Sequence, residues 1–292
     1  MQEIIPQLSK VPHGYKHLEV SPVCGALGAE ISGVDLSSLP SDEVLAEIRK
    51  ALNEYLVIFF RDQDLTPDQQ KAFGRLFGTL NVHPVYEPLP GHPEILQVVK
   101  EADARDNIGD TWHSDATFLD EPPMGSILYA KEIPPFGGDT LFANLCLAYE
   151  MLSEGMRNML DGMNAVHSDA FLTQVNAERN ETRSTKLKTG QLNARETLHP
   201  VVRTHPETGR KGLFINEPFT DRIEGMSTKE SAPIIEELLA HIKRPEFTCR
   251  FRWQLGSIAF WDNRCTHHYA LNDYHGYRRE MHRVTVNGDR PF

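Results

Sequence analysis

The chain of 292 residues is 40% hydrophobic and 24% charged, and its formal net charge is −11. These proportions are ordinary for a globular protein. No run of about 20 consecutive apolar residues is present, which excludes a membrane-spanning helix. The acidic balance and the lack of a lysine and arginine cluster argue against a nucleic-acid partner. A small anion held by a local arginine remains compatible with this charge.

Cysteine usage and the N-terminal sequence predict a cytoplasmic protein. Met1–Tyr15 has neither the basic start nor the apolar core of a secretory signal peptide. The cysteines form no Cys-x-x-Cys pair, so we expect reduced thiols rather than a disulfide scaffold. With no internal repeat, linker or break in composition, residues 1–292 are expected to form a single domain. The cysteines are Cys24, Cys146, Cys249 and Cys265.

Capping signals predict where several helices begin. Thr66 and Gln69 form a capping-box pattern, with proline at the first helical position. Ser227 has a similar pattern, but Pro233 would then lie inside the helix, so a start at Ser231 is equally allowed. Helices are expected after Ser41, after Thr66, over residues 147–163, and after Ser227 or Ser231.

Short runs rich in β-branched and aromatic residues predict many strands. Leu56–Phe60 is entirely apolar, as in a strand buried on both faces. Gly137 and Gly138 predict a turn into a further strand that carries Thr140. Residues 170–195 contain few large apolar side chains and are expected to form a mobile lid. In all, strands are expected over residues 56–60, 94–99, 112–118, 126–130, 201–204, 212–216, 247–253, 257–261 and 282–287.

The first chemical motif is His113-Ser114-Asp115. On a strand, the side-chain period of two would point His113 and Asp115 to the same face. A neutral imidazole and a carboxylate on one face are two parts of the facial triad that binds mononuclear non-haem Fe(II). Because His-x-Asp also occurs by chance, the motif gains meaning only with a distant second histidine and an anion-binding arginine.

The second motif supplies both of these. His267 and His268 follow a strand-like run, and neighbouring strand residues face opposite sides, so only one of them should reach a metal. Arg278, Arg279 and Arg283 come shortly after. A guanidinium group can hold a carboxylate through two parallel hydrogen bonds of fixed geometry.

Taken together, four motifs resemble the taurine dioxygenase family of Fe(II)/2-oxoglutarate dioxygenases, over residues 25–291. The resemblance implies a mainly β fold with flanking helices (α+β), the double-stranded β-helix or jelly roll. It also implies Fe(II), the cosubstrate 2-oxoglutarate, O₂, release of succinate and CO₂, and a homo-oligomer (dimer or tetramer). The motifs are Trp112-His113-x-Asp115, Gly137-Gly138-Asp139-Thr140, Trp261-Asp262-Asn263-Arg264-x-Thr266-x-His268 and Arg279-x-x-x-Arg283.

Matched residue by residue, the resemblance assigns a metal site and a cosubstrate site. The family's iron ligands correspond to His113, Asp115 and His268, because one residue separates the motif threonine from the last ligand. The far carboxylate of 2-oxoglutarate would be held by Thr140 and Arg279.

The resemblance also implies a site for a small anionic organic substrate. Hydroxylation next to a sulfonate, sulfate or ether oxygen would give an adduct that collapses to an aldehyde or ketone. The substrate-binding positions are His83, Tyr86, the backbone amide of Ala116, Phe219 and Arg283.

One position departs from taurine dioxygenase. Its asparagine four residues before the first metal histidine helps to hold the substrate amine, and here that position is Gly109. Ile108–His113 and Arg222–Met226 instead resemble aryloxypropionate dioxygenases. We therefore expect taurine to be a poor substrate relative to an anion without an amine.

Two other classes of protein could use the same histidines and carboxylate. One is a zinc-type hydrolase, and the other is a non-catalytic metal-binding jelly roll. The hydrolase would have no use for the pair Thr140 and Arg279, which favours the dioxygenase over it.

Overall fold

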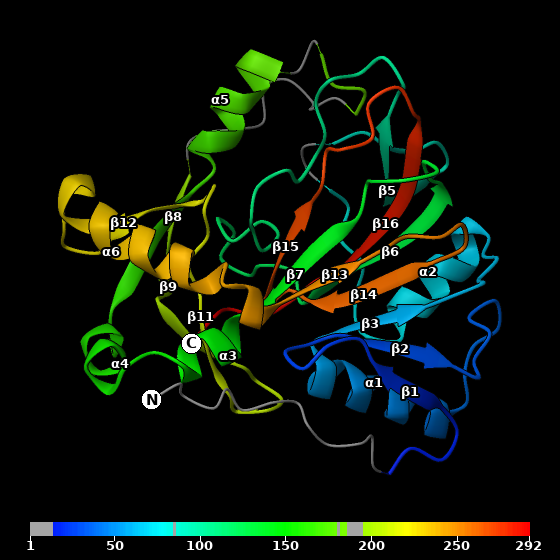
Figure 1. Cartoon of the computed structure of the whole chain (residues 1–292), viewed down its shortest axis with the longest axis horizontal. Helices are drawn as coiled ribbons and strands as arrows, with labels where there is room; N and C mark the ends of the chain where they lie inside the picture. The colour runs from blue at the N-terminus through cyan, green and yellow to red at the C-terminus, as the bar shows by residue number, and fades with distance from the viewer. Residues whose placement is uncertain (1–13, 84–85, 180–181, 186–194) are drawn as a thin grey trace.

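The computed structural model describes residues 14–83, 86–179, 182–185 and 195–292. An eight-stranded sheet runs through it, and only the pair β2 and β3 is parallel. Figure 1 shows this sheet beside the strands of a smaller one. In spatial order the large sheet contains β1 (Glu19–Pro22), β2 (Ala29–Ser32), β3 (Val57–Phe60), β14 (Ile258–Asp262), β6 (Gly125–Glu132), β16 (Arg279–Val286), β5 (His92–Lys100) and β4 (Pro88–Leu89).

A three-stranded antiparallel sheet packs against the large one. Phe59 of β3 stacks on Phe251 with ring centroids 3.9 Å apart and lies 5.8 Å from Phe142. Both partners belong to the smaller sheet, so the two sheets share one aromatic core, as in a jelly roll. The smaller sheet contains β13 (Thr248–Phe251), β7 (Thr140–Asn144) and β15 (Thr266–Ala270), in that spatial order.

Helices flank the sheets where capping predicted them. Ser41 caps the first helix, and full capping boxes at Thr66 and Ser227 begin two others, with Pro233 accommodated inside the helix that starts after Ser227. None of the helices in the described ranges is both long and apolar enough to cross a membrane. The helices are α1 (Asp42–Tyr55), α2 (Pro67–Arg75), α3 (Leu145–Glu150), α4 (Glu154–Leu160), α5 (Ala170–Arg179), α6 (Thr228–Ile242) and the 3₁₀ turn η1 (Pro245–Phe247).

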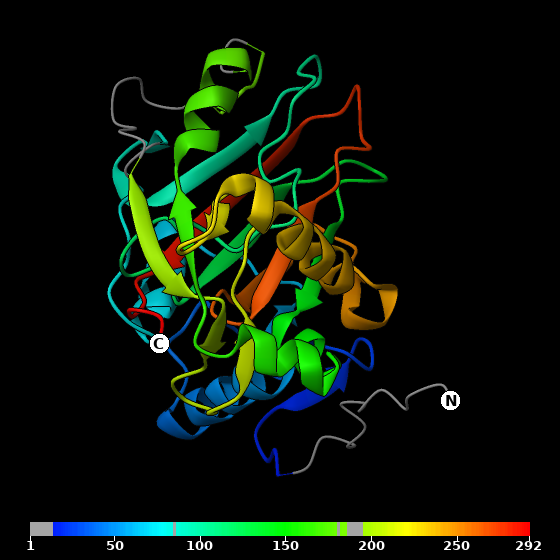
Figure 2. The same ribbon diagram turned by 90° about the vertical axis from the view of Figure 1, so that its left-hand side faces the viewer.

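The remaining strands form two small sheets. The strand pair predicted over 201–204 and 212–216 is present as β10 and β11. In both views α5 lies at the opposite end of the molecule from α1 (Figure 1, Figure 2). These strands are β8 (Asn164–Ser168), β9 (Glu196–Pro200) and β12 (Thr220–Ile223) in one sheet, and β10 (Val202–Thr204) and β11 (Lys211–Leu213) in the other.

The structure adds detail to two predicted segments, the helical region 147–163 and the lid 170–195. The helical region expected over 147–163 contains two helices, because Ser153 leaves the helical conformation and caps α4 with its hydroxyl. Within the expected lid, 170–179 form α5 and 182–185 lie on β5. Residues 180–181 and 186–194 fall outside the described ranges, so the mobile lid stays a prediction.

Candidate functional site

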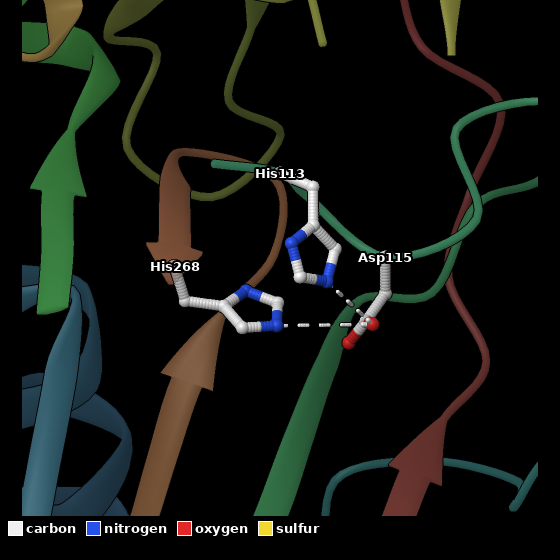
Figure 3. Close-up of side chains that lie close together, drawn as sticks. All are labelled: His113, Asp115 and His268. Atoms are coloured by element: carbon white, nitrogen blue, oxygen red, sulfur yellow. Dashed lines mark ion pairs between the residues drawn. The ribbon is translucent and has the colours of Figure 1, made fainter. Parts of the chain in front are cut away.

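His113, Asp115 and His268 converge from two distant parts of the chain. His268 lies on β15, and its backbone pairs with that of His113 through hydrogen bonds of 2.8 and 3.1 Å. The Nε2 atoms of both histidines lie 3.9 Å from Asp115 Oδ1. The three ligand atoms are within 4.8 Å of one another and point to a common centre (Figure 3). This donor set and spacing suit a transition-metal ion.

The strand predicted over 112–118 is wrong. His113 makes one isolated bridge to His268, and a turn begins at Asp115. Ala116 has φ of 49°, which no regular strand permits. Asn263 replaces the missing strand partner, because its Oδ1 accepts the Asp115 N–H at 2.6 Å and its Nδ2 donates to the Asp115 carbonyl at 3.1 Å. The sequence analysis assigned Asn263 no role of its own.

Burial fixes the protonation states that metal binding requires. Desolvation lowers the pKa of both His113 and His268, so the imidazoles are neutral at neutral pH. Burial alone would raise the pKa of Asp115, but the positive charge of Arg283 and a hydrogen bond from Ser126 oppose it, and that pKa lies far below its usual range. His113 Nδ1 donates to the Thr111 carbonyl at 2.7 Å, which leaves Nε2 as its metal-binding atom.

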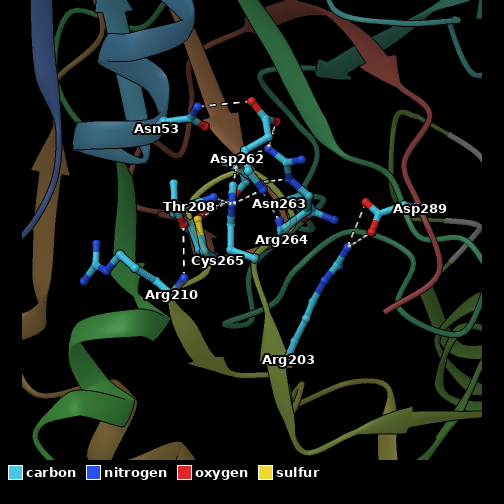
Figure 4. Close-up of polar contacts among 12 residues, drawn as sticks. Asn53, Arg203, Thr208, Arg210, Asp262, Asn263, Arg264, Cys265 and Asp289 are labelled. Carbon is cyan, nitrogen blue, oxygen red and sulfur yellow. Dashed lines mark hydrogen bonds and ion pairs between the residues drawn. The ribbon is translucent and has the colours of Figure 1, made fainter. Parts of the chain in front are cut away.

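A second cluster of potential metal ligands lies nearby, but its groups hydrogen-bond to one another and to the backbone. His205, Asp262 and Cys265 offer ligand atoms within 4.8 Å of one another. The Asp262 carboxylate is already saturated, since it accepts Nε and Nη2 of Arg264 at 2.9 and 2.6 Å and faces His205 Nε2 at 2.9 Å (Figure 4). This network holds the turn between β14 and β15, and thereby positions Asn263 for its contacts with Asp115.

Thr140, the first residue of β7 in the small sheet, and Arg279, the first residue of β16 in the large sheet, both lie against Trp253. Trp253 Nε1 donates to Thr140 Oγ1 at 3.0 Å, and the Arg279 guanidinium lies 5.8 Å from the Trp253 ring. Arg279 is only 4% exposed, yet its Nε and Nη2 have no hydrogen-bond partner among the described residues. A buried guanidinium with free donors is suited to a carboxylate, so these residues fit the distal end of 2-oxoglutarate.

Gly138 provides the room for this arginine. Its φ of 68° lies in the left-handed region, and an added Cβ would stand 3.3 Å from Arg279 Cδ and 3.2 Å from Tyr274 Cδ1. The glycine at position 138 of the motif is therefore required because a larger residue would crowd Arg279 and Tyr274.

A cavity of about 110 Å³ opens beside the metal site. At roughly 10–15 Å³ for each water-sized group, it has room for about ten non-hydrogen atoms. Arg283 Nη1 donates to Asp115 Oδ1 at 2.9 Å, and the buried Nε of Arg283 has no partner among the described residues. All five residues expected at the substrate site line this cavity: His83, Tyr86, Ala116, Phe219 and Arg283.

Most of the remaining wall is apolar. Phe118 packs edge-on against Phe219 with ring centroids 5.1 Å apart. The wall also carries polar groups, among them Asp110, Asn107 and Arg183, and Arg183 is a buried cationic residue that was not singled out from the sequence. The further apolar lining residues are Ile108, Leu119, Pro123, Phe171, Leu172 and Pro218.

Comparison with known proteins decides the family. Residues 19–285 match the model of the taurine catabolism dioxygenase TauD, TfdA family. The chain belongs to this family. A structure of a taurine dioxygenase from Burkholderia xenovorans is 39% identical and superposes with a TM-score of 0.81, covering 94% of this chain and 91% of that one. The jelly roll expected from the motifs is thereby confirmed.

Relatives with assigned activities agree on the reaction class. An alpha-ketoglutarate-dependent sulfate ester dioxygenase of Pseudomonas putida is 38% identical, over 97% of this chain and 94% of its own. An alkylsulfatase of Acinetobacter baylyi is also 38% identical, over 94% and 86%. This TauD, TfdA family member is an alpha-ketoglutarate-dependent dioxygenase, as the four motifs predicted.

Proposed function

We propose that this dioxygenase uses Fe(II), 2-oxoglutarate and O₂ to hydroxylate a carbon atom of a small anionic substrate. Its metal ligands are His113, Asp115 and His268. The supporting observation is one arrangement: two neutral imidazoles and an ionised carboxylate converge, with the cavity beside them. Three ligands on one face of a metal ion leave the opposite face open.

The cosubstrate would be held at its far end by Arg279 and Thr140. The unpartnered nitrogens of Arg279 favour this role, because a bound carboxylate would satisfy them. Iron bound with 2-oxoglutarate would activate O₂, so that one oxygen atom enters the substrate C–H bond and the other enters the succinate that forms as CO₂ is released. The chain itself positions the substrate and keeps water away from the reaction.

Alkyl sulfate esters are the first substrate class to test. The names of two relatives point to sulfate esters, and the cavity joins an apolar wall to an end that carries the guanidinium of Arg283 and the imidazole of His83. Hydroxylation of the carbon that bears the ester oxygen gives a hemiacetal-like adduct, which releases sulfate and leaves an aldehyde. Sulfonates and aryloxyalkanoates offer a similar anion and remain in the proposal.

We also propose that the protein is cytoplasmic and that it acts as a dimer or tetramer on a small organic anion.

Two measurements test the function. Anaerobic addition of Fe(II) and 2-oxoglutarate should produce a weak visible charge-transfer band, which neither a zinc hydrolase nor a storage jelly roll would give. Succinate release across alkyl sulfates, sulfonates and aryloxyalkanoates should then identify the class. A band that survives in His268→Ala would count against the metal assignment.

A further inference from the structure

Arg183 is carried by a short segment that lies along the edge of the large sheet. The Val99 N–H donates to Thr185 Oγ1 at 2.8 Å, and this hydroxyl donates back to the Val99 carbonyl at 3.0 Å. The Glu101 N–H donates to Ser184 Oγ at 2.8 Å, and Thr182 donates to Asp106. These contacts fix the backbone on both sides of Arg183 against β5 and the loop that follows it.

The side chain of Arg183 turns inward from that segment. Although the segment lies at the sheet edge, Arg183 is 5% exposed and its Nε is buried without a hydrogen-bond partner in the described ranges. No carboxylate in those ranges forms an ion pair with it. Burying a guanidinium without a counter-charge is unfavourable. Such a group suits a site that receives an anion.

The cavity beside the metal site contains Arg183 together with Arg283. Burial raises the pKa of the Tyr86 phenol, and the positive charges of Arg183 and Arg283 oppose that rise. Both guanidinium groups therefore act on the same buried side chain, at the end of the cavity where His83 lies.

We propose that Arg183 is a second arginine anchor for the anionic head of the substrate, and that the head it fits is a sulfate or sulfonate rather than a carboxylate. Arg283 already commits Nη1 to Asp115, which leaves its Nε for a ligand. A tetrahedral head with three terminal oxygens can accept from Arg283, His83 and Arg183 at once, whereas a planar carboxylate offers only two oxygens. The inference rests on the proposed function and narrows its substrate class.

The test compares two ligands of equal chain length, hexyl sulfate and hexanoate. Binding to the enzyme loaded with Fe(II) and 2-oxoglutarate is measured by calorimetry without O₂, and the visible band shows that each variant is loaded. In Arg183→Gln we expect the dissociation constant of hexyl sulfate to rise on the order of 10- to 100-fold, and that of hexanoate by less than about threefold. Arg183→Lys keeps the positive charge but loses the planar guanidinium, so its dissociation constant for hexyl sulfate should lie between those of the wild type and Arg183→Gln.

Two controls isolate the role of Arg183. Arg157→Gln removes the same charge from α4, outside the cavity, and should leave both dissociation constants unchanged. Tyr86→Phe separates direct anchoring from an effect through the phenol. If Tyr86→Phe matches Arg183→Gln and the double variant adds nothing, Arg183 only positions Tyr86 and the inference is overturned.

The remaining outcomes are also decisive. Unchanged affinity for hexyl sulfate in Arg183→Gln overturns the anchor, and an equal loss for hexyl sulfate and hexanoate overturns the preference for a three-oxygen head. If the wild-type enzyme binds hexanoate but no alkyl sulfate, the substrate class of the proposed function fails and this inference fails with it. That result differs from a wild-type enzyme that binds hexyl sulfate with no dependence on Arg183.

Discussion

Arg283 donates from Nη1 to Asp115 Oδ1 at 2.9 Å, and this same oxygen lies 3.9 Å from the metal-binding nitrogens of His113 and His268. The arginine therefore contacts a proposed metal ligand and lines the proposed substrate cavity at once. It keeps the carboxylate ionised and oriented before a metal arrives.

Arg283→Met should therefore weaken metal binding as well as substrate binding. Loss of this partner raises the pKa of Asp115 and frees its side chain, so we expect Fe(II) affinity to fall about 10-fold or more. Anaerobic Fe(II) titration without substrate measures this effect. Arg278→Met removes an arginine whose partners are surface glutamates, and should bind Fe(II) as the wild type does. Equal affinities in all three proteins would contradict the prediction.

Removing the guanidinium of Arg279 should act on the cosubstrate alone. Arg279→Met loses charge-assisted hydrogen bonds, so we expect the KM for 2-oxoglutarate to rise about 100-fold, equivalent to about 3 kcal/mol. Thr140→Ala should raise it less, by about 10-fold. Initial rates at saturating primary substrate give these values. If the KM for 2-oxoglutarate stays at the wild-type level in Arg279→Met, Arg279 does not hold the cosubstrate.

Asn263 should matter for stability because it serves the backbone of a metal ligand. Asn263→Ala leaves the buried Asp115 N–H without a partner, which costs about 1–3 kcal/mol. Urea unfolding of the metal-free protein measures the change. Asn287→Ala, which breaks exposed hydrogen bonds to Thr79 and Asn81, should cost about 0.5 kcal/mol or less. If both variants lose the same free energy of unfolding, the contact with Asp115 contributes no more to stability than an exposed hydrogen bond.

Buried neutral histidines should make the protein sensitive to mild acid. Burial lowers the pKa of His167 to about 3, from an ordinary value of 6.5. Below pH 6.5 the unfolded chain binds a proton at this residue that the folded chain does not, so stability falls as pH falls from 6.5 toward 3. His167→Gln should reduce this slope by about 1.4 kcal/mol per pH unit. Urea unfolding between pH 5 and 6.5 tests this, and an unchanged slope would refute it.

Gly109 should exclude efficient use of taurine. A Cβ at this position would lie 3.2 Å from His113 Cε1, and its φ of 80° disfavours other residues, so no side chain can reach a substrate amine from here. We expect kcat/KM for taurine to be at least about 10-fold below that for 1-butanesulfonate, which carries no amine, because one hydrogen bond to a charged amine is missing. Succinate release provides the comparison. Turnover of taurine at the rate of 1-butanesulfonate would overturn this view.

Local sequence alone determined much of the framework. Ser41 and Thr66 begin their helices as predicted, and Ser227 is one of the two starts allowed for the last one, because capping involves a hydroxyl and backbone groups only three residues away. The apolar run at 57–60 became the fully buried strand β3. The choice of His268 over His267, and of Arg279 and Arg283 among the arginines, came from the resemblance to the family rather than from local sequence.

Tertiary structure decided what depended on distant partners. Residues 112–118 have a strand-like composition, yet the side chain of Asn263, 148 positions away from Asp115, takes the place of a neighbouring strand. Arg183 looks like one charge among many in a polar segment, and only its position against β5 buries it in the cavity. Propensity and spacing report interactions along the chain, whereas burial and pairing of a polar group depend on which remote surface covers it.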